Sequence, residues 1–410
     1  MISAPVFVRQ ADRSARWSAI ALGFSIPISV AADNVLLVLV LAGWLAGGAY
    51  RDKFLTARRH PVALAALALF VLLLIGTLYG DAPTSAAWGQ VGKYIDLMFV
   101  PIFLFLFRDP ATRRHALYAL AAALALVLIL SCLIKAGIVP ANPLTSGDAA
   151  SPFVFKKRLT HNILMAYAAF LFAWLALQSP ASRTRLGWAA LAVLAIINVT
   201  MMVQGATGYL VLCGLTLLLA YSRFGRRGFG IAVLGIGLFF ATLLMLPSVF
   251  QQRMNTITNE ISEWLPGQPT QTSSGLRLEF YRNSFEIVRA HPLFGTGTGS
   301  FSQVYADHVA GTAMAATTNP HNEYLNIAVQ LGCIGLAALL YLFYCEWRYA
   351  GALTTTYERE LAHGLVITFT IGCLFNSLLM DHVEGLLFAW TSGVLFAGLK
   401  SPHQSGASAR

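Results

Sequence analysis

The stretch HALYALAAALALVLILSCLIK, residues 115–135, decides the class of fold. It is long enough to cross a bilayer core of about 30 Å, which takes about 20 apolar residues in a helix. Segments like it recur along the chain, in which 57% of residues are hydrophobic and only 11% are charged. Backbone polar groups in lipid must find partners within their own segment, which favours helices. The sequence therefore predicts an all-α polytopic membrane protein.

We expect about twelve transmembrane helices. Asp33 and Asn34 separate the first two, because a charge at mid-membrane is costly and a tight hairpin avoids it. The expected spans are residues 17–31, 34–50, 61–79, 93–107, 115–135, 161–178, 186–203, 207–222, 228–246, 323–345, 361–380 and 383–399.

The spans define four parts of the chain. Spans one to nine occupy residues 1–246, and spans ten to twelve occupy residues 323–400. Between them, residues 247–322 form a large polar loop that we expect to contain helix. Residues 401–410 form an expected cytoplasmic tail.

The lysines and arginines predict which side each loop faces. Nineteen of the 28 fall in alternating loops that the positive-inside rule assigns to the cytoplasm, so the loop 247–322 faces outward. The net charge of +10 is then mostly a topology signal, and without a basic motif interleaved with aromatic residues we expect no nucleic-acid partner. Nine basic residues oppose the bias on the outer side: Lys93, Lys135, Lys156, Lys157, Arg158, Arg253, Arg277, Arg282 and Arg289.

The loop 247–322 is the part of the chain where we expect the chemistry, because long loops in compact domains are usually functional or disordered. Apolar residues recur in it at spacings of three, four and three, which predicts an amphipathic helix: Leu278, Tyr281, Phe285 and Val288. Arg282, Glu286 and Arg289 lie on another face. Two interpretations stay open: a surface helix with Arg282 paired to Glu286, or a cluster of guanidinium groups that binds phosphate.

A glycine-rich segment, HPLFGTGTG, follows at residues 291–299. Backbone amides of such a loop can cradle phosphate, but neither the GxGxxG pattern nor a GK[ST] ending is present. A tight turn that returns the chain to the membrane is the favoured interpretation.

The residues Asn319, Pro320, His321 and Asn322 open the next apolar span. We expect Asn319 to cap a helix, Pro320 to occupy its first position and His321 to lie in its first turn. There the helix dipole favours neutral imidazole and attracts anions. A lone histidine is more often structural, but the surrounding arginines favour a functional one.

A similar arrangement occurs before the span 161–178, where Lys156, Lys157 and Arg158 precede His161. The basic run would also suit lipid headgroups, and Arg158 and His161 are the better candidates for ligand binding. Further outer-side residues are expected near the same cavity: Lys93, Tyr94, Gln204, Thr207, Asp381, His382 and Glu384.

No metal or other cofactor is expected. Asp381, His382 and Glu384 match no specific ligand spacing, and the first outer loops lack a paired acidic motif. The five cysteines lie in apolar spans without CxxC spacing, so they predict neither a zinc site nor disulfides.

Three segments resemble the signature region of the O-antigen ligase and polymerase superfamily: residues 274–277 (SGLR), 291–297 (HPLFGTG), and 321–325 (HNEYL) continuing through Gly332 and Gly335. The resemblance is strongest to O-antigen ligases, which are glycosyltransferases of the GT-C type in the bacterial inner membrane. It implies transfer of O-antigen polysaccharide from undecaprenyl diphosphate to a sugar hydroxyl of lipid A-core, at a site facing the periplasm.

The same resemblance implies roles for single residues. His321 matches the histidine that the family requires for activity, and Arg277 matches the loop arginine that engages the diphosphate. Gly205 to Gly208 (GATG) replace a Ser-Arg-Gly motif found in many relatives, so a phosphate contact there is missing or supplied elsewhere, for instance by Arg158. The expected substrate-binding residues are Arg277, Arg282, Arg289, Arg158, His161, Asn322 and Lys93.

Three other functions stay open. An O-antigen polymerase would share the donor, and a protein O-oligosaccharyltransferase would differ in its acceptor. A transporter or lipid flippase would place charges at mid-span depth and show paired halves, whereas the charges here gather on one side.

Overall fold

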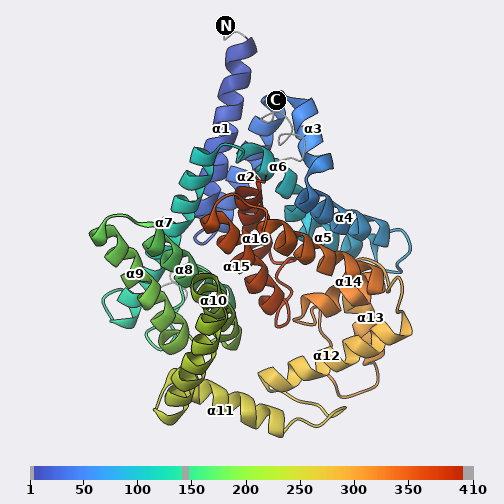
Figure 1. The fold of residues 1–410 in the computed structure, drawn as a ribbon. Coiled ribbons are helices and arrows are strands. Elements are labelled where there is room, and N and C mark those ends of the chain that lie inside the picture. The colour runs from blue at the N-terminus through green and yellow to red at the C-terminus, as the bar shows by residue number, and fades with distance from the viewer. Residues whose placement is uncertain (1–3, 141–146, 400–410) are drawn as a thin grey trace.

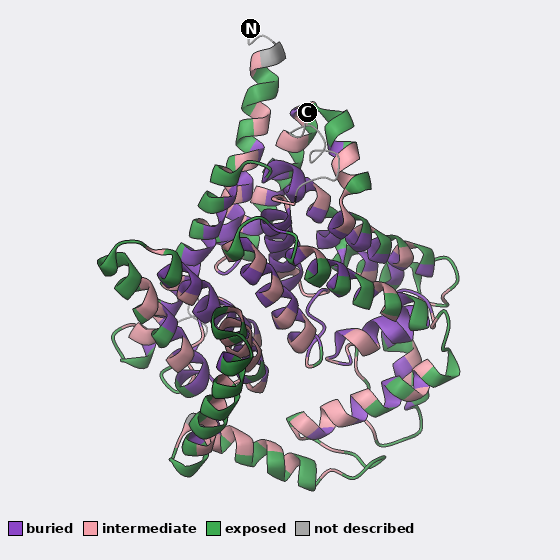
Figure 2. Cartoon of the chain, in the orientation of Figure 1, coloured by how far each residue is buried: buried purple, intermediate pink, exposed green. Residues whose placement is uncertain are grey.

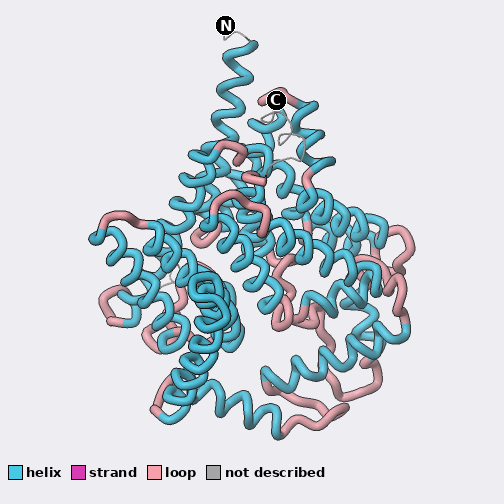
Figure 3. Tube along the Cα trace, viewed as in Figure 1, coloured by secondary structure: helices cyan, strands magenta, loops and turns pink. Residues whose placement is uncertain are grey.

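A computed structural model of the chain describes residues 4–140 and 147–399. Within these ranges every regular element is a helix, as Figure 3 shows, which confirms the all-α prediction. Five helices are long and apolar enough to cross a membrane, or up to seven if each of two bent pairs forms one span. These helices fit a multi-pass membrane protein, and the count of twelve spans stays a prediction. The expected tail, residues 401–410, lies outside the described residues.

The helices follow one another with short connections, except around the loop before α8 and the segment between α11 and α14 (Figure 1). Their bounds are α1 Ala4–Ser25, α2 Val30–Ala46, α3 Tyr50–Arg59, α4 Pro61–Gly76, α5 Thr84–Lys93, η1 Ile95–Met98, α6 Phe99–Leu106, α7 Pro110–Lys135, α8 Arg158–Gln178, α9 Ser182–Ile197, η2 Asn198–Met202, α10 Ala206–Met245, α11 Val249–Ser262, α12 Ser273–Ala290, α13 Phe301–His308, α14 Glu323–Ala350, α15 Thr356–Gly372 and α16 His382–Phe396.

Helix α10 folds back on itself at Gly225, whose φ of +61° is open to glycine but costly for other residues. The rings of Tyr209 and Phe240 lie 6.3 Å apart, centroid to centroid. In a straight helix their Cα atoms would be about 45 Å apart. The two arms, residues 206–224 and 226–245, therefore form an antiparallel hairpin and correspond to the eighth and ninth expected spans.

Helix α14 reverses in the same way at Gly332, which has φ +63°. The ring centroids of Tyr324 and Phe343 are 6.4 Å apart, whereas a straight helix would separate these residues by about 28 Å. The expectation of one continuous span over residues 323–345 is therefore wrong. A short first arm, residues 323–331, precedes a longer second arm, residues 333–350.

The first hairpin of the chain lies earlier than expected. Helix α1 ends at Ser25, and the Ser29 hydroxyl caps α2 by accepting a 3.3 Å hydrogen bond from the amide of Ala32. Asp33 is thus in the first turn of α2 and fully buried, instead of forming the turn. The turn moves because Pro27 and the Ser29 cap together end one helix and start the next.

Burial divides the helices between core and periphery (Figure 2). The apolar window of α8 is 89% buried, whereas that of α10 is only 11% buried. Because exposed apolar surface of this extent is unfavourable in water, the arms of α10 are suited to contact with lipid.

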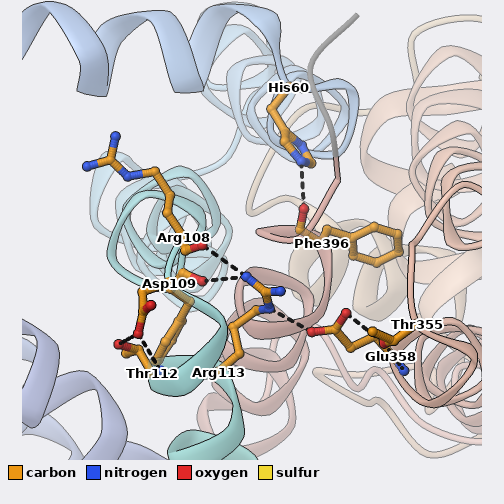
Figure 4. A network of polar contacts seen from close by, with 9 residues as sticks. His60, Arg108, Asp109, Thr112, Arg113, Thr355, Glu358 and Phe396 are labelled. Atoms are coloured by element: carbon orange, nitrogen blue, oxygen red, sulfur yellow. Dashed lines mark hydrogen bonds and ion pairs between the residues drawn. The ribbon is translucent and has the colours of Figure 1, made fainter. Parts of the chain in front are cut away.

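Several helix ends meet at one end of the bundle, shown in Figure 4. At the start of α7, the Arg113 guanidinium donates from Nε to Glu358 Oε1 of α15 over 2.6 Å, and both side chains are almost fully buried. The ring of His60, just before α4, lies 3.1 Å from the carbonyl oxygen of Phe396 at the end of α16. Loops that the charge pattern assigns to the cytoplasm therefore lie together.

Candidate functional site

His321 lies immediately outside the first arm of α14. Asn322 is the N-cap of this helix, because its side-chain oxygen accepts from the amide of Leu325 over 3.0 Å. The expectation that Asn319 caps the helix and that His321 lies in its first turn is therefore wrong. Asn319 instead accepts from the His321 amide over 2.8 Å and holds His321 at φ +54°, an uncommon conformation for a non-glycine residue.

Helix α12 and the loop between α15 and α16 hold His321 in place. Its ring stacks on Phe280 of α12 with centroids 6.3 Å apart and planes inclined by 27°. The Tyr281 hydroxyl lies 3.1 Å from the His321 carbonyl oxygen and 2.8 Å from that of Leu374. The His321 Nδ1 atom lies 3.1 Å from Oδ1 of Asn376. A strained backbone that is fixed by so many contacts is typical of a functional residue.

Three guanidinium groups from three helices lie within electrostatic range of one another, and one of them acts on Tyr281, which contacts His321. Arg277 of α12 lies four residues before Tyr281, and burial lowers the pKa of its guanidinium, with the charges of Arg253 and Arg158 acting in the same direction. Tyr281 and Glu260 oppose that effect. Among the described residues, none of the three arginines makes an ion pair or hydrogen bond.

Unpaired positive charges that repel one another favour an anionic ligand, because the anion would offset their repulsion. The structure therefore brings together two of the expected arginines, Arg277 and Arg158. It adds Arg253 of α11, whose position near them the sequence did not reveal.

The other arginines expected at the site have different surroundings. Arg282 is exposed and its Nε lies 3.2 Å from Oε1 of Glu286, which confirms the i,i+4 pair of the surface-helix interpretation. Arg289 is exposed at the end of α12. The amphipathic helix itself is confirmed, but Phe285 of its expected apolar face is 55% exposed.

The amide groups of Asn322 are used within the protein. Its oxygen caps α14, and its nitrogen donates to the carbonyl oxygen of Leu374 over 3.0 Å. In this structure Asn322 therefore ties α14 to the loop between α15 and α16.

His161 of α8 is fully buried, and both ring nitrogens have partners. Nε2 lies 3.1 Å from Oδ1 of Asn198, and Nδ1 accepts from the Val154 amide over 3.2 Å. This is the environment of a structural histidine, and it leaves no ring atom free for a ligand.

The Gly205 to Gly208 segment has a packing role. A Cβ atom on Gly205 or Gly208 would lie 2.2 Å or 2.5 Å from the Asn162 side chain, closer than real contacts allow. These glycines therefore let the start of α10 approach α8.

Lys93 is exposed at the end of α5, within electrostatic range of Asp381. The acidic residues near it do not share a site. Asp381 accepts from Asn376 Nδ2 over 3.0 Å, whereas His382 Nδ1 faces Asp96 at 3.5 Å. In the described part of the chain no three or more His, Cys, Asp or Glu side chains are grouped to hold a metal ion.

The glycine-rich segment packs against the break in α14. The amides of Thr296 and Gly297 donate to the carbonyl oxygens of Val329 and Gln330, both over 2.8 Å. The amide of Gly299 donates to the Gln330 side chain over 2.7 Å. These amides are occupied, which fits a structural turn and leaves them unable to cradle a phosphate.

A buried chain of hydrogen bonds continues from Gln330 to Glu323, two residues after His321. Gln330 donates to Asn326 Oδ1 over 3.0 Å, and Asn326 donates to the Tyr94 hydroxyl over 2.9 Å. Tyr94 donates to Glu323 Oε1 over 2.5 Å, and the other Glu323 oxygen accepts from the Leu379 amide over 2.8 Å. The chain fixes the first arm of α14, and with it the position of His321.

The sequence did not indicate three residues that contact His321: Asn376, Tyr281 and Phe280. Asn376 lies in a run without a recognisable motif, so nothing in the sequence indicated it. Tyr281 was assigned to an apolar face because its ring follows the helical period, and its hydroxyl partners are visible only in the fold.

Two comparisons with known proteins bear on this arrangement. Residues 168–340 match the family model described as O-antigen ligase. The chain is also 24% identical over 269 residues to an uncharacterized protein of Haemophilus influenzae, an alignment that covers 60% of this chain and 61% of that relative.

The matched region contains α12 with Arg277, His321 and the break in α14 at Gly332. The match confirms the resemblance that the sequence motifs indicated, and the family indicates an enzyme of the glycan ligase or polymerase type in a membrane. Over residues 168–340 the chain is therefore similar to the O-antigen ligase family.

Proposed function

We propose that the protein is an O-antigen ligase of the bacterial inner membrane. It transfers O-antigen polysaccharide as one block from undecaprenyl diphosphate to a sugar hydroxyl of lipid A-core, at a site that faces the periplasm. The observation that carries the proposal is that Arg253 and Arg158 lie within electrostatic range of Arg277, which in turn acts on Tyr281, the residue whose hydroxyl contacts the carbonyl oxygen of His321.

The reaction is a single displacement. The acceptor hydroxyl oxygen attacks the anomeric carbon of the donor glycan and forms the new glycosidic bond, while the bond from that carbon to the diphosphate oxygen breaks. His321 takes the hydroxyl proton as general base. One displacement inverts the anomeric centre.

The arginines stabilise the negative charge that grows on the leaving diphosphate. A diphosphate leaves without prior protonation, so the reaction needs no second carboxylic acid of the kind that hydrolases use. Because guanidinium groups supply the positive charge, the proposed reaction is independent of a metal ion.

The test is transfer by purified protein in liposomes, with undecaprenyl-diphosphate-linked glycan as donor, lipid A-core as acceptor and EDTA present. Wild type is expected to form glycosylated lipid A-core, and His321→Ala to lose at least about a hundredfold in rate, since general bases contribute about 10²–10⁴. A His308→Ala control removes an exposed histidine of α13 that faces Glu286, and its rate should match wild type.

Other outcomes assign other functions. Longer lipid-linked glycan without product on lipid A-core would indicate a polymerase, and product on a periplasmic protein would indicate an O-oligosaccharyltransferase. No turnover of any donor, together with movement of lipid-linked glycan between leaflets, would favour a flippase. Normal transfer by His321→Ala would refute the role given to this residue.

A further inference from the structure

The loop between α15 and α16, residues 373–381, places an amide and a carboxyl group in line behind His321. Nδ1 of His321 lies 3.1 Å from Oδ1 of Asn376, and Nδ2 of Asn376 donates to Oδ2 of Asp381 over 3.0 Å. Asn376 is buried, and Asp381 is half-buried. Although Asp381 precedes α16 directly, its side chain does not cap that helix.

The partners fix the direction of each hydrogen bond. An ionised carboxylate only accepts, so the amide nitrogen of Asn376 must face Asp381 and its oxygen must face His321. An amide oxygen also only accepts, so Nδ1 of His321 must carry the hydrogen. Neutral His321 then has its lone pair on Nε2, the atom that a general base needs.

We propose that Asn376 and Asp381 are positioning residues that hold His321 in the Nδ1–H form and stabilise the imidazolium formed when Nε2 takes the acceptor proton. This inference rests on the proposed role of His321 as the base. It also gives Lys93 a role different from substrate binding, because its charge acts on Asp381.

The basic groups around Asp381 favour its ionised state and oppose the effect of burial. Burial raises the pKa of this carboxyl group above its ordinary value, while the hydrogen bond from Asn376 and the charges of Lys157, Lys93 and His321 lower it. Two further acids, Glu323 and Glu384, also lie within electrostatic range of Asp381. As pH falls, Asp381 takes up its proton earlier than an exposed aspartate would, and its stabilisation of the imidazolium is then lost.

The central test compares Asp381→Asn with the exchange Asn376→Asp/Asp381→Asn in the liposome assay. In Asp381→Asn the neighbouring amide both donates and accepts, so Asn376 is free to turn and place hydrogen on Nε2 of His321. We expect kcat to fall about tenfold or more, with little change in KM for the donor. The acidic limb of the pH–rate profile should move to lower pH, because the imidazolium loses a nearby negative charge.

The exchange rebuilds the chain in the other order. A carboxylate at position 376 accepts from both His321 and the amide at position 381, so the Nδ1–H form is fixed again. We expect the exchange variant to recover most of the kcat that Asp381→Asn loses. The acidic limb of its pH–rate profile should lie about one pH unit above that of wild type, because the carboxylate now contacts the imidazolium. A purely structural role would not move the two pH profiles in opposite directions.

Controls separate the possible failures. Asp307→Asn removes an exposed carboxylate of α13 and should behave as wild type. Unchanged kcat and pH profile in Asp381→Asn would overturn the inference, as would an exchange variant no more active than Asp381→Asn alone. If His321→Ala is inactive in the same assay, the proposed function survives that failure. If Asp381→Asn does not fold, Asp381→Glu serves instead, because it keeps the charge, and its pH–rate profile is compared with that of the double variant Asn376→Gln/Asp381→Glu. If position 376 transmits the effect of the carboxylate to His321, the acidic limb of Asp381→Glu lies at higher pH than that of the double variant. Acidic limbs at the same pH would refute the inference.

Discussion

Among single residues, Arg277 offers the sharpest test of how the donor is bound. It is half-buried and within electrostatic range of Tyr281 and two other arginines, so it meets a phosphate with less competition from water than an exposed arginine does. Arg277→Ala is expected to lower kcat/KM about a hundredfold, the usual loss when one donor to a developing oxyanion is removed. Arg277→Lys should restore only part of this loss, since an ammonium group does not bind phosphate in the bidentate manner of a guanidinium. The rates are measured against donor concentration in liposomes.

The matched control for Arg277 is Arg183→Gln, an exposed arginine at the start of α9 and outside the arginine cluster. It removes the same charge and should leave kcat/KM unchanged. Equal rates for Arg277→Ala and wild type would exclude Arg277 from the transition-state contacts. Comparable losses in Arg277→Ala and Arg183→Gln would instead mean that overall charge, and not a specific contact, governs donor binding.

At the level of elements, the reversal of α14 is the feature on which the site depends. A Cβ atom on Gly332 would lie 2.3 Å from the Leu293 backbone, and φ is +63°. Gly332→Ala should therefore destabilise the protein by about 3 kcal/mol, from backbone strain and overlap together. We expect the unfolding temperature, followed by tryptophan fluorescence in detergent, to fall by several degrees. Gly230→Ala is the control, because a Cβ there would meet nothing within 4 Å; an equal fall in both variants would contradict this account.

The same elements show what the sequence predicts and what it does not. Long apolar runs predict helices, because length and composition suffice for a bilayer. Whether a glycine within such a run lies inside a helix, as Gly364 does, or reverses the chain, as Gly332 does, depends on what packs beside it. The start of α14 was misplaced for a related reason: Asn319 and Asn322 are equally good caps, and only the hydrogen bond to Leu325 distinguishes them.

The site was predictable to the extent that its residues carry a local signal. His321 and Arg277 lie in motifs, whereas Arg253 is indicated only by its charge on the outer side and Asn376 by nothing in the sequence. Their roles arise when segments far apart in the sequence meet. His161 shows the converse, since its neighbours in the sequence indicated a ligand but the fold buries it against Asn198.

For the whole molecule, the arrangement of helix ends leads to a prediction about the membrane. Helix α15 begins at the buried Arg113–Glu358 pair of Figure 4 and runs about 25 Å to the loop that holds Asn376. The ends of the bundle thus separate the expected cytoplasmic arginines from His321.

A cysteine replacing Ser273, at the start of α12, should react with a membrane-impermeant maleimide added to intact cells whose outer membrane has been made permeable. A cysteine replacing Ser182, at the start of α9, should react only after the inner membrane is opened. Both serines are exposed, and the native cysteines are first replaced by alanine. The opposite pattern would place His321 in the cytoplasm, where a lipid A-core acceptor on the periplasmic face is out of reach, and the ligase proposal would fail together with the topology.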